Sequence, residues 1–250
     1  MTQLSDLTGK KAIVTGGSNG IGAATVRMLA EHGARVMIGY HKREDAAREL
    51  LKSLPGSGHD IVQVSLEDLS TVETMAKKAA DTFKTVDILV NSAGFTKPVP
   101  HKNLEALDIP QFDSILISSV RGPYSIIRAL LPLLRASGEA TVINVSSISG
   151  FTGSGSSVVY CAGKAALDNM TVSLGRALGP EIRVLSVSPG ATATDFVPGR
   201  DRARLEVEAA KTPLQKVVEA EDVALAILAC VTHLRRTTGT RIIVDGGRHL

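Results

Sequence analysis

Residues 10–22 read KKAIVTGGSNGIG. The first seven residues contain the apolar run Ala12–Val14 and predict a buried strand, and the last three begin a helix that runs to about residue 32. Gly16, Gly20 and Gly22 lie between and at these elements with the spacing G-x3-G-x-G. Glycines let a chain turn sharply and approach a pyrophosphate, while the free N–H groups of the following helix point at that anion. This context favours a dinucleotide-binding turn over a plain tight turn.

Apolar runs alternate with amphipathic ones along the rest of the chain. The predicted strands cover residues 10–16, 34–40, 60–65, 86–91, 141–146, 182–187 and 241–245. The predicted helices cover residues 20–32, 44–53, 70–84, 109–135, 158–178 and 219–232, the fourth being broken or starting anew at Gly122-Pro123. Strands without clean alternation, separated by helices, predict an α/β fold: a doubly wound (Rossmann) parallel sheet with helices on both faces. No linker or repeat divides the chain, so residues 1–250 are expected to form a single domain.

Bulk composition excludes several classes of protein. The chain has 250 residues, of which 44% are hydrophobic and 21% are charged, so disorder is not expected. The net charge of +3 is small, and Arg235, Arg236 and Arg241 have no interleaved aromatic residues, so nucleic-acid binding is not expected. The N-terminus lacks a signal-peptide core, and the apolar run at 125–134 is too short to cross a bilayer. Two cysteines do not make a disulfide framework, so we expect a cytoplasmic protein.

The end of the second strand predicts the choice of cofactor. NAD-binding proteins usually carry an acidic residue there, which binds the ribose hydroxyls. Here no acidic residue occurs before Glu44, and Lys42 and Arg43 precede it. Either base could pair with a 2′-phosphate, although both could simply be solvated at the start of the next helix. The pattern favours NADP(H).

Tyr160 and Lys164 lie four residues apart in the helix that follows the fifth strand. This spacing places both side chains on one helical face. A tyrosine normally titrates near pH ~10, and a nearby ammonium group should lower that pKa by stabilising the phenolate. The pair is therefore a plausible acid/base unit, although a structural tyrosine is an alternative for such a pair taken alone.

Taken in order, these motifs resemble those of the short-chain dehydrogenase/reductase family over essentially the whole chain. The matching segments are Thr15–Gly22, Asn91–Gly94 with Ser92 in place of a second Asn, Ser147, Tyr160 with Lys164, and Ser188–Thr194. The nearest likeness is to the 3-oxoacyl-acyl-carrier-protein reductase-like group. The resemblance implies an enzyme that interconverts a ketone and a secondary alcohol by hydride transfer with NADP(H), and no metal site.

The resemblance also implies the roles of individual residues. Tyr160 would exchange a proton with the substrate oxygen, Lys164 would lower the pKa of the tyrosine and bind the nicotinamide ribose, and Ser147 would stabilise developing charge. The implied cofactor contacts are Gly16, Ser18, Asn19, Gly20, Ile21, Gly22, Tyr40, His41, Lys42, Ser65, Leu66, Asn91, Ala93, Gly94, Tyr160, Lys164, Pro189, Gly190, Thr192 and Thr194. The candidate substrate contacts are Phe95, Ser149, Phe151 and Phe196, with core packing the alternative for the aromatics and strand-end capping for the serine.

Two positions depart from the family pattern. Ser65 stands where an adenine-contacting Asp is usual, so contacts to adenine there would rely on the backbone. Ser119, three residues before Gly122, stands where the family has an Asn that holds a water of a proton relay behind the lysine. We count Ser119 as a fourth catalytic candidate, because a hydroxyl can also hold a water. It is also the single feature that favours an alternative function, a nicotinamide-nucleotide sensor or scaffold with impaired catalysis.

Residues 191–214 have weak periodicity and mixed charge, and a loop of this length is typical of a substrate lid. The family places its lid here. The sequence does not select among a long acyl chain, a small ketone and a sugar as the substrate. By resemblance we expect a homotetramer built on the long helices and the C-terminal strand.

Overall fold

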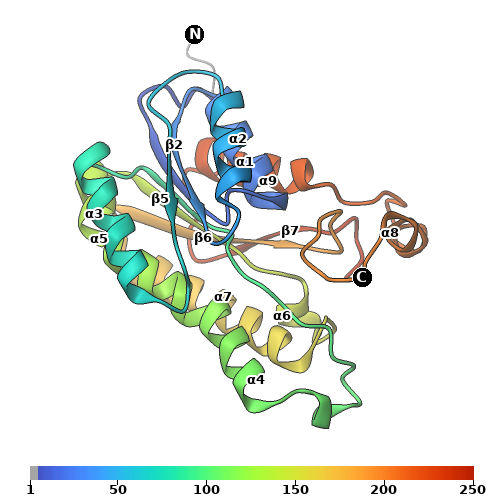
Figure 1. Ribbon diagram of the computed structural model, residues 1–250. Helices are drawn as coiled ribbons and strands as arrows, with labels where there is room; N and C mark the ends of the chain where they lie inside the picture. The colour runs from blue at the N-terminus through green and yellow to red at the C-terminus, as the bar shows by residue number, and fades with distance from the viewer. Residues whose placement is uncertain (1–4) are drawn as a thin grey trace.

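The computed structural model describes residues 5–250. It contains one sheet of seven parallel strands in the order β3-β2-β1-β4-β5-β6-β7 (Figure 1). The strands are β1 (Lys11–Thr15), β2 (Arg35–Tyr40), β3 (Asp60–Gln63), β4 (Ile88–Asn91), β5 (Ala140–Val145), β6 (Ile182–Pro189) and β7 (Arg241–Val244). The expected doubly wound parallel sheet is confirmed.

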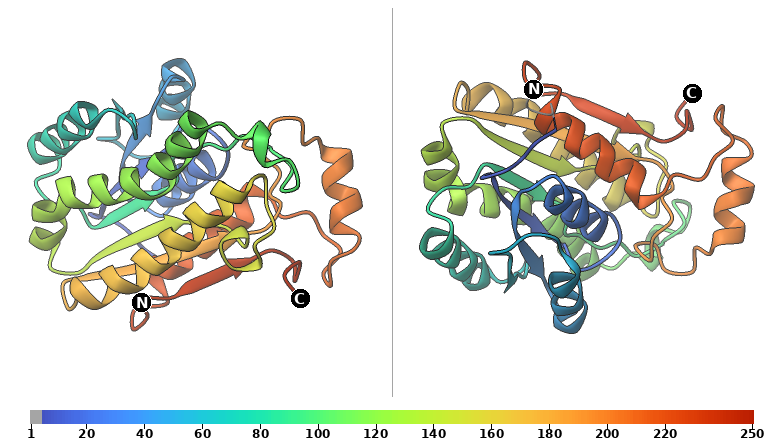
Figure 2. Two further views of the ribbon diagram at one scale, coloured as in Figure 1. Left: turned by 90° about the horizontal axis from the view of Figure 1, so that it is seen from below. Right: turned by 90° about the horizontal axis from the view of Figure 1, so that it is seen from above.

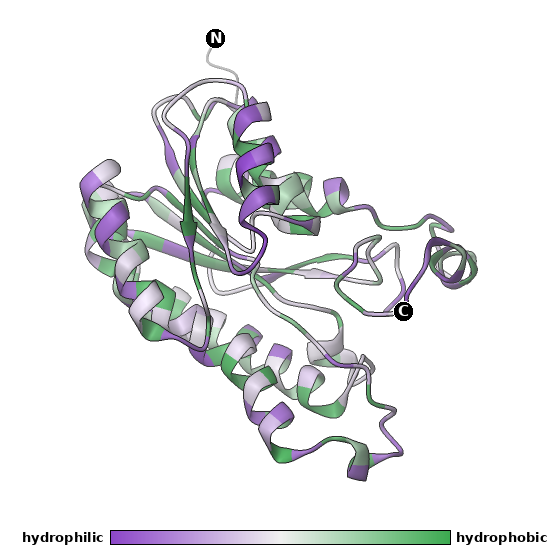
Figure 3. Ribbon diagram, in the orientation of Figure 1, coloured by the Kyte–Doolittle hydropathy of each residue, from purple (hydrophilic) through white to green (hydrophobic). Residues whose placement is uncertain are grey.

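Helices cover both faces of this sheet (Figure 2). They are α1 (Gly20–Glu31), α2 (Glu44–Ser53), α3 (Leu69–Thr82), α4 (Ile109–Leu116), α5 (Gly122–Ser137), α6 (Ser149–Thr152), α7 (Val158–Ala177), α8 (Arg202–Ala209) and α9 (Ala220–Thr232), with a short 3-10 helix η1 (Leu104–Ala106). One apolar core lies under α1, α2 and α9, and the other lies under α3 and α5. The strands between these layers are mainly hydrophobic (Figure 3), as burial on both faces requires. Among residues 5–250, no helix combines the length and the apolar character needed to cross a membrane.

The strand order reverses between β1 and β4, and this reversal positions the site. From β1 the chain winds outward to β2 and β3, and β4 returns to the other side of β1, where Thr15 lies beside Asn91. Ligands of such sheets bind in the crevice at the carboxyl ends of the strands, at this switch point. The backbone N–H of Ala93 donates to Oγ1 of Thr15 across a distance of 3.2 Å, which closes the bottom of the crevice.

The helical region at 109–135 is continuous where a break was expected. Between α4 and α5 the chain makes a π-helical turn, η2 (Ile117–Arg121), and the N–H of Gly122 donates to the carbonyl of Ile117. Pro123 has no N–H, so the carbonyl of Ser119 cannot receive its α-helical hydrogen bond. The proline therefore widens the helix locally instead of ending it.

Two helices were not predicted. α6 is a single turn after the fifth strand, too short to give a periodic signal. α8 lies within 191–214, which was expected to lack regular structure, and only its Leu205 and Ala209 are buried. Its N-terminus is capped by Asp201, whose side chain accepts a hydrogen bond from the N–H of Arg204 at 2.8 Å. α8 stands away from the helices that cover the sheet, beside the C-terminus (Figure 1).

Candidate active site

The glycine turn after β1 leaves no room for side chains. A Cβ on Gly22 would lie 2.1 Å from the carbonyl oxygen of Gly16, and a Cβ on Gly16 would lie 2.8 Å from the Cα of Ala93. Asn19 precedes α1 without a side-chain cap, and the first turn of the helix holds no acidic residue. The first N–H groups of α1 are therefore open to an anion, at the positive end of the helix dipole. The turn fits a dinucleotide pyrophosphate.

The segment after β6 folds over this turn. The side chain of Thr194 lies against Gly20, where an added Cβ would be 3.1 Å from Cγ2 of Thr194. Thr192 pairs with Val218 in an isolated parallel bridge, which fixes the start of the segment. Pro189 accepts a hydrogen bond from the N–H of Ile148 at 3.1 Å. Of the predicted contacts after β6, Thr194 therefore lies against the glycine turn, while Pro189 and Thr192 are held by Ile148 and Val218.

Ser147, Tyr160 and Lys164 are brought together at the end of β5. They are 8%, 8% and 7% exposed. The α7 helix that carries two of them is capped by Ser157, whose side chain accepts from the N–H of Tyr160 at 3.3 Å. Nζ of Lys164 donates to the carbonyl of Val145 at 2.8 Å and lies 5.7 Å from the centre of the Tyr160 ring.

Burial decides the proton affinities in this site. It raises the pKa of Tyr160 to about 12, against a smaller lowering by a hydrogen bond with Ser147. Burial also lowers the pKa of Lys164 to about 8, and the carboxylate of Asp168 partly offsets this. Lys164 is not among the groups that shift the pKa of Tyr160 here, so the lowering expected from the lysine stays a prediction. Both groups are removed from water, which disfavours the charged form of each.

The two serines of the π-helical turn have different surroundings. Oγ of Ser118 donates to the carbonyl of Ile115 at 3.0 Å, within its own helix. Ser119 is also buried and packs against Gly163 of α7, where an added Cβ would lie 2.8 Å from Cβ of Ser119. Because Gly163 precedes Lys164, the structure places Ser119 beside the lysine's turn of α7.

Ser147 and Ser149 form a local pair. Oγ of Ser147 donates to Oγ of Ser149 at 3.1 Å and accepts from the N–H of Ser149 at the same distance. Ser149 is buried, and its hydroxyl helps to fix the orientation of the Ser147 side chain through this hydrogen bond. The hydroxyl of Ser149 thus bonds the side chain of Ser147 and not a backbone group at the strand end.

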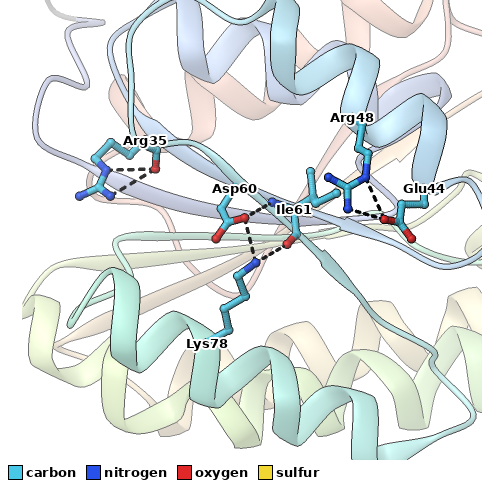
Figure 4. A network of polar contacts seen from close by, with 7 residues as sticks. Arg35, Glu44, Arg48, Asp60, Ile61 and Lys78 are labelled. Atoms are coloured by element: carbon cyan, nitrogen blue, oxygen red, sulfur yellow. Dashed lines mark hydrogen bonds and ion pairs between the residues drawn. The ribbon is translucent and has the colours of Figure 1, made fainter.

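The end of β2 presents free bases. His41, Lys42 and Arg43 are exposed, and neither Lys42 nor Arg43 forms an ion pair within residues 5–250. Glu44, the first acid after the strand, is held by Arg48, whose Nε donates to it at 2.8 Å (Figure 4). A hydrogen bond with the hydroxyl of Tyr40 also lowers the pKa of Glu44. The carboxylate is thus engaged within its own helix and by Tyr40.

Three predicted cofactor contacts have side chains engaged elsewhere. The amide of Asn91 donates to Oδ1 of Asn144 at 2.9 Å inside the sheet, and Oγ of Ser65 accepts from the N–H groups of Glu67 and Asp68. Leu66 is buried against Gly122. At these positions the backbone is the part available to a ligand.

Of the three aromatic substrate candidates, Phe196 packs against Tyr160. The ring of Phe196 lies 5.9 Å from that of Tyr160, centre to centre. Phe151 instead lies under the guanidinium of Arg241 at 4.7 Å and meets the ring of His249 edge-on at 5.7 Å. Phe95 is exposed. The different outcomes arise because α6 turns Phe151 toward β7 and the C-terminus.

Sequence reasoning missed two features near the tyrosine. Leu107 and Phe112 pack against the buried cluster that contains Tyr160. Asp168 is buried one turn after Lys164, accepts from Oγ of Ser186 at 2.9 Å and pairs with Arg241 at 3.3 Å. The i, i+4 spacing from Lys164 was a signal for Asp168, whereas no local pattern points from Leu107 or Phe112 to a site.

Comparison with known proteins agrees with this geometry. A family model described as enoyl-(acyl carrier protein) reductase matches residues 16–249. A 3alpha-hydroxysteroid dehydrogenase of Mediterraneibacter gnavus is 35% identical over 245 residues, covering 96% of this chain and 97% of that protein. The 3-oxoacyl-acyl-carrier-protein reductase FabG of Chlamydia muridarum is 31% identical over 247 residues, covering 96% and 98%.

A solved structure adds a likeness in three dimensions. The crystal structure of a short chain dehydrogenase from Burkholderia cenocepacia in complex with NADP superposes with a TM-score of 0.88 at 32% identity, covering 98% of this chain and 99% of that one. Because these matches span nearly the whole chain, the chain belongs to the short-chain dehydrogenase/reductase family and is an oxidoreductase.

Proposed function

We propose that the protein interconverts a ketone and a secondary alcohol with NADP(H) as the hydride carrier. The observation that carries the proposal is the buried group of Ser147, Tyr160 and Lys164 at the carboxyl end of β5, at the same edge of the sheet as the glycine turn. The free bases Lys42 and Arg43 support a phosphorylated cofactor, as does the likeness to a dehydrogenase solved with NADP.

The side chains divide the chemistry between them. The nicotinamide, when bound, supplies or accepts the hydride. Tyr160 remains protonated across the neutral range because burial raises its pKa to about 12, so it is poised to donate its proton to a carbonyl oxygen. Ser147 hydrogen-bonds the same phenol, and its hydroxyl, which donates to Ser149 here, would turn to donate to the substrate oxygen that gains charge. Lys164 holds positive charge behind the tyrosine and would bind the nicotinamide ribose.

The cofactor would lie along the switch-point crevice. The glycine turn and the N-terminus of α1 would bind the pyrophosphate, and Lys42 with His41 would bind the 2′-phosphate. The backbones of Ser65, Leu66 and the Asn91–Gly94 segment would contact the adenosine. Pro189, Gly190, Thr192 and Thr194 would hold the nicotinamide end.

Ser119 would serve the proton relay by holding a water. The hydroxyl is buried beside Lys164, and Pro123 leaves the carbonyl of Ser119 without its helical partner. Hydroxyl and carbonyl together offer a water one donor and two acceptors.

We propose that residues 191–214 form the substrate lid and that the active form is a homotetramer. Phe196 lies against Tyr160 from within the proposed lid. An apolar hollow between the long helices supports self-association, and Tyr124 in it is exposed. The hollow is lined by Leu116, Ile117, Val120, Arg121, Tyr124, Ala166 and Met170.

The test is a panel of ketones and alcohols, including 3-oxoacyl thioesters, assayed with NADPH and NADH. We expect turnover with NADPH, and Tyr160→Phe should lose it while NADPH still binds. Undiminished turnover by Tyr160→Phe would contradict the mechanism, and a preference for NADH would contradict the role of Lys42. Tight NADPH binding without reduction of any ketone would favour the sensor over the enzyme.

A further inference from the structure

The proposed lid carries a cation without a hydrogen-bonded partner close to the catalytic tyrosine. Arg200 is half-buried just before α8, four residues after Phe196, whose ring contacts Tyr160. Its backbone N–H donates to the carbonyl of Val197 at 3.2 Å, so the chain folds back on itself between the two side chains. Within residues 5–250, the guanidinium of Arg200 has no hydrogen bond and no ion pair.

Glu208, the lid acid whose charge acts on Arg200, is already paired with other arginines. Glu208 of α8 accepts from Nε of Arg204 at 3.2 Å and from Nη1 of Arg248 at 2.8 Å, so each of its carboxylate oxygens serves another arginine. Arg204 and Arg248 thus share one carboxylate, and Arg200 feels its charge without an ion pair. Three guanidinium groups near one carboxylate leave this cluster on the proposed lid with excess positive charge.

The charge of Arg200 acts on the reacting group itself. It lowers the pKa of Tyr160, against the larger effect of burial, and the turn between Val197 and Arg200 follows directly on Phe196, whose ring contacts Tyr160. Burial in turn lowers the pKa of Arg200, although a guanidinium keeps its proton in proteins. A half-buried charge without a partner is unfavourable, and an anion that pairs with it recovers that energy.

We infer that Arg200 binds a carboxylate of the substrate, so that the protein acts on oxo acids and hydroxy acids whose apolar part lies against Phe196. A guanidinium matches a carboxylate with two parallel N–H···O bonds, which would orient the substrate carbonyl toward Tyr160. This inference rests on the proposed function and narrows its substrate class. Arg200 would be a specificity residue, leaving the hydride and proton steps to the groups already described.

The test compares acids with their uncharged counterparts. Linear oxo acids with different distances between carbonyl and carboxylate, each paired with its methyl ester, are reduced with saturating NADPH. The wild-type protein should prefer at least one acid to its ester. Arg200→Gln should lower kcat/KM for that acid by about 10- to 100-fold and change the ester by less than about threefold. Arg200→Lys should recover part of the loss. Arg27→Gln, which removes a positive charge from the exposed face of α1, should change kcat/KM for neither the acid nor the ester.

The outcomes separate this inference from the proposed function. Reduction of the esters with no preference for any acid would overturn the carboxylate site and leave the proposed function standing. Equal losses for acid and ester with weaker NADPH binding in Arg200→Gln would assign the arginine to the cofactor instead and overturn the inference. If no member of the panel is reduced, calorimetry of the acids with the protein–NADP⁺ complex tests whether the carboxylate site exists. Binding of an acid that Arg200→Gln abolishes supports the site, and no binding at about 10 mM overturns it.

Discussion

The side chain of Lys164 carries an ammonium group that is buried at the centre of the site. Removing this charge should raise the free energy of unfolding of the protein and abolish its activity. The folded structure lowers the pKa of this lysine from 10.5 to about 8, with burial as the main cause. The charged form is therefore less favourable in the folded state than in the unfolded chain. Lys164→Met removes the charge and keeps most of the apolar stem.

The expected size of the effect follows from two contributions. Lowering the pKa to about 8 corresponds to a destabilisation of the charged form by about 3 kcal/mol. The variant also loses the hydrogen bond to the carbonyl of Val145, a loss of about 1 kcal/mol. At neutral pH the variant should therefore be more stable than wild type by about 2 kcal/mol.

The sign of the pH dependence follows from the direction of the shift. The penalty is fully present below the folded-state pKa of about 8 and disappears as pH rises toward 10.5, where the unfolded lysine also loses its proton. Wild type should thus gain stability relative to Lys164→Met over that interval. The two should be equally stable at about pH 10, above which the lost hydrogen bond leaves the variant less stable.

Urea unfolding of both proteins at equal concentration, from neutral to alkaline pH, measures this difference. Lys77→Met on the exposed face of α3 is the matched control and should change the free energy of unfolding by less than about 0.5 kcal/mol at every pH. A Lys164→Met variant that is less stable than wild type at neutral pH would refute the reasoning. The same variant should show little or no turnover with NADPH.

Three further substitutions test other parts of the site. Gly22→Ala should weaken NADPH binding, followed by fluorescence titration, by about 10- to 100-fold, because its Cβ would lie 2.1 Å from the carbonyl oxygen of Gly16; unchanged affinity would argue against the pyrophosphate role of the turn. Ser119→Asn should keep or raise kcat, and turnover that arises only in this variant would favour the sensor. Asp168→Asn should lower the pKa of Lys164 further, so the alkaline limb of the pH profile of kcat/KM should move to lower pH; an unmoved limb would contradict the coupling.

Much of the fold could be predicted because its signals are local. The strand and helix pattern placed the elements of the parallel sheet, and the glycine turn located the switch point, since these follow from period and spacing alone. The π-helical turn was missed, although Pro123 was visible. A proline predicts that a helix is perturbed, because its backbone nitrogen carries no hydrogen-bond donor. Whether the helix ends there or widens into a π-helical turn depends on the packing of neighbouring elements.

The sequence by itself determined which chemical groups the protein has and their order along the chain. These groups are a glycine turn, a strand-end serine and a Tyr160–Lys164 pair on one helical face. Tertiary structure alone decided their properties. Burial raises the pKa of Tyr160 to about 12, where the neighbouring lysine alone suggested a lowered value. The tertiary structure places the ring of Phe196 against Tyr160, whereas it places Phe151 under the guanidinium of Arg241. Tertiary structure also leaves Arg200 without an ion pair, because Glu208 binds other arginines. Hydration and charge pairing depend on groups far apart in the chain, so no local pattern encodes them.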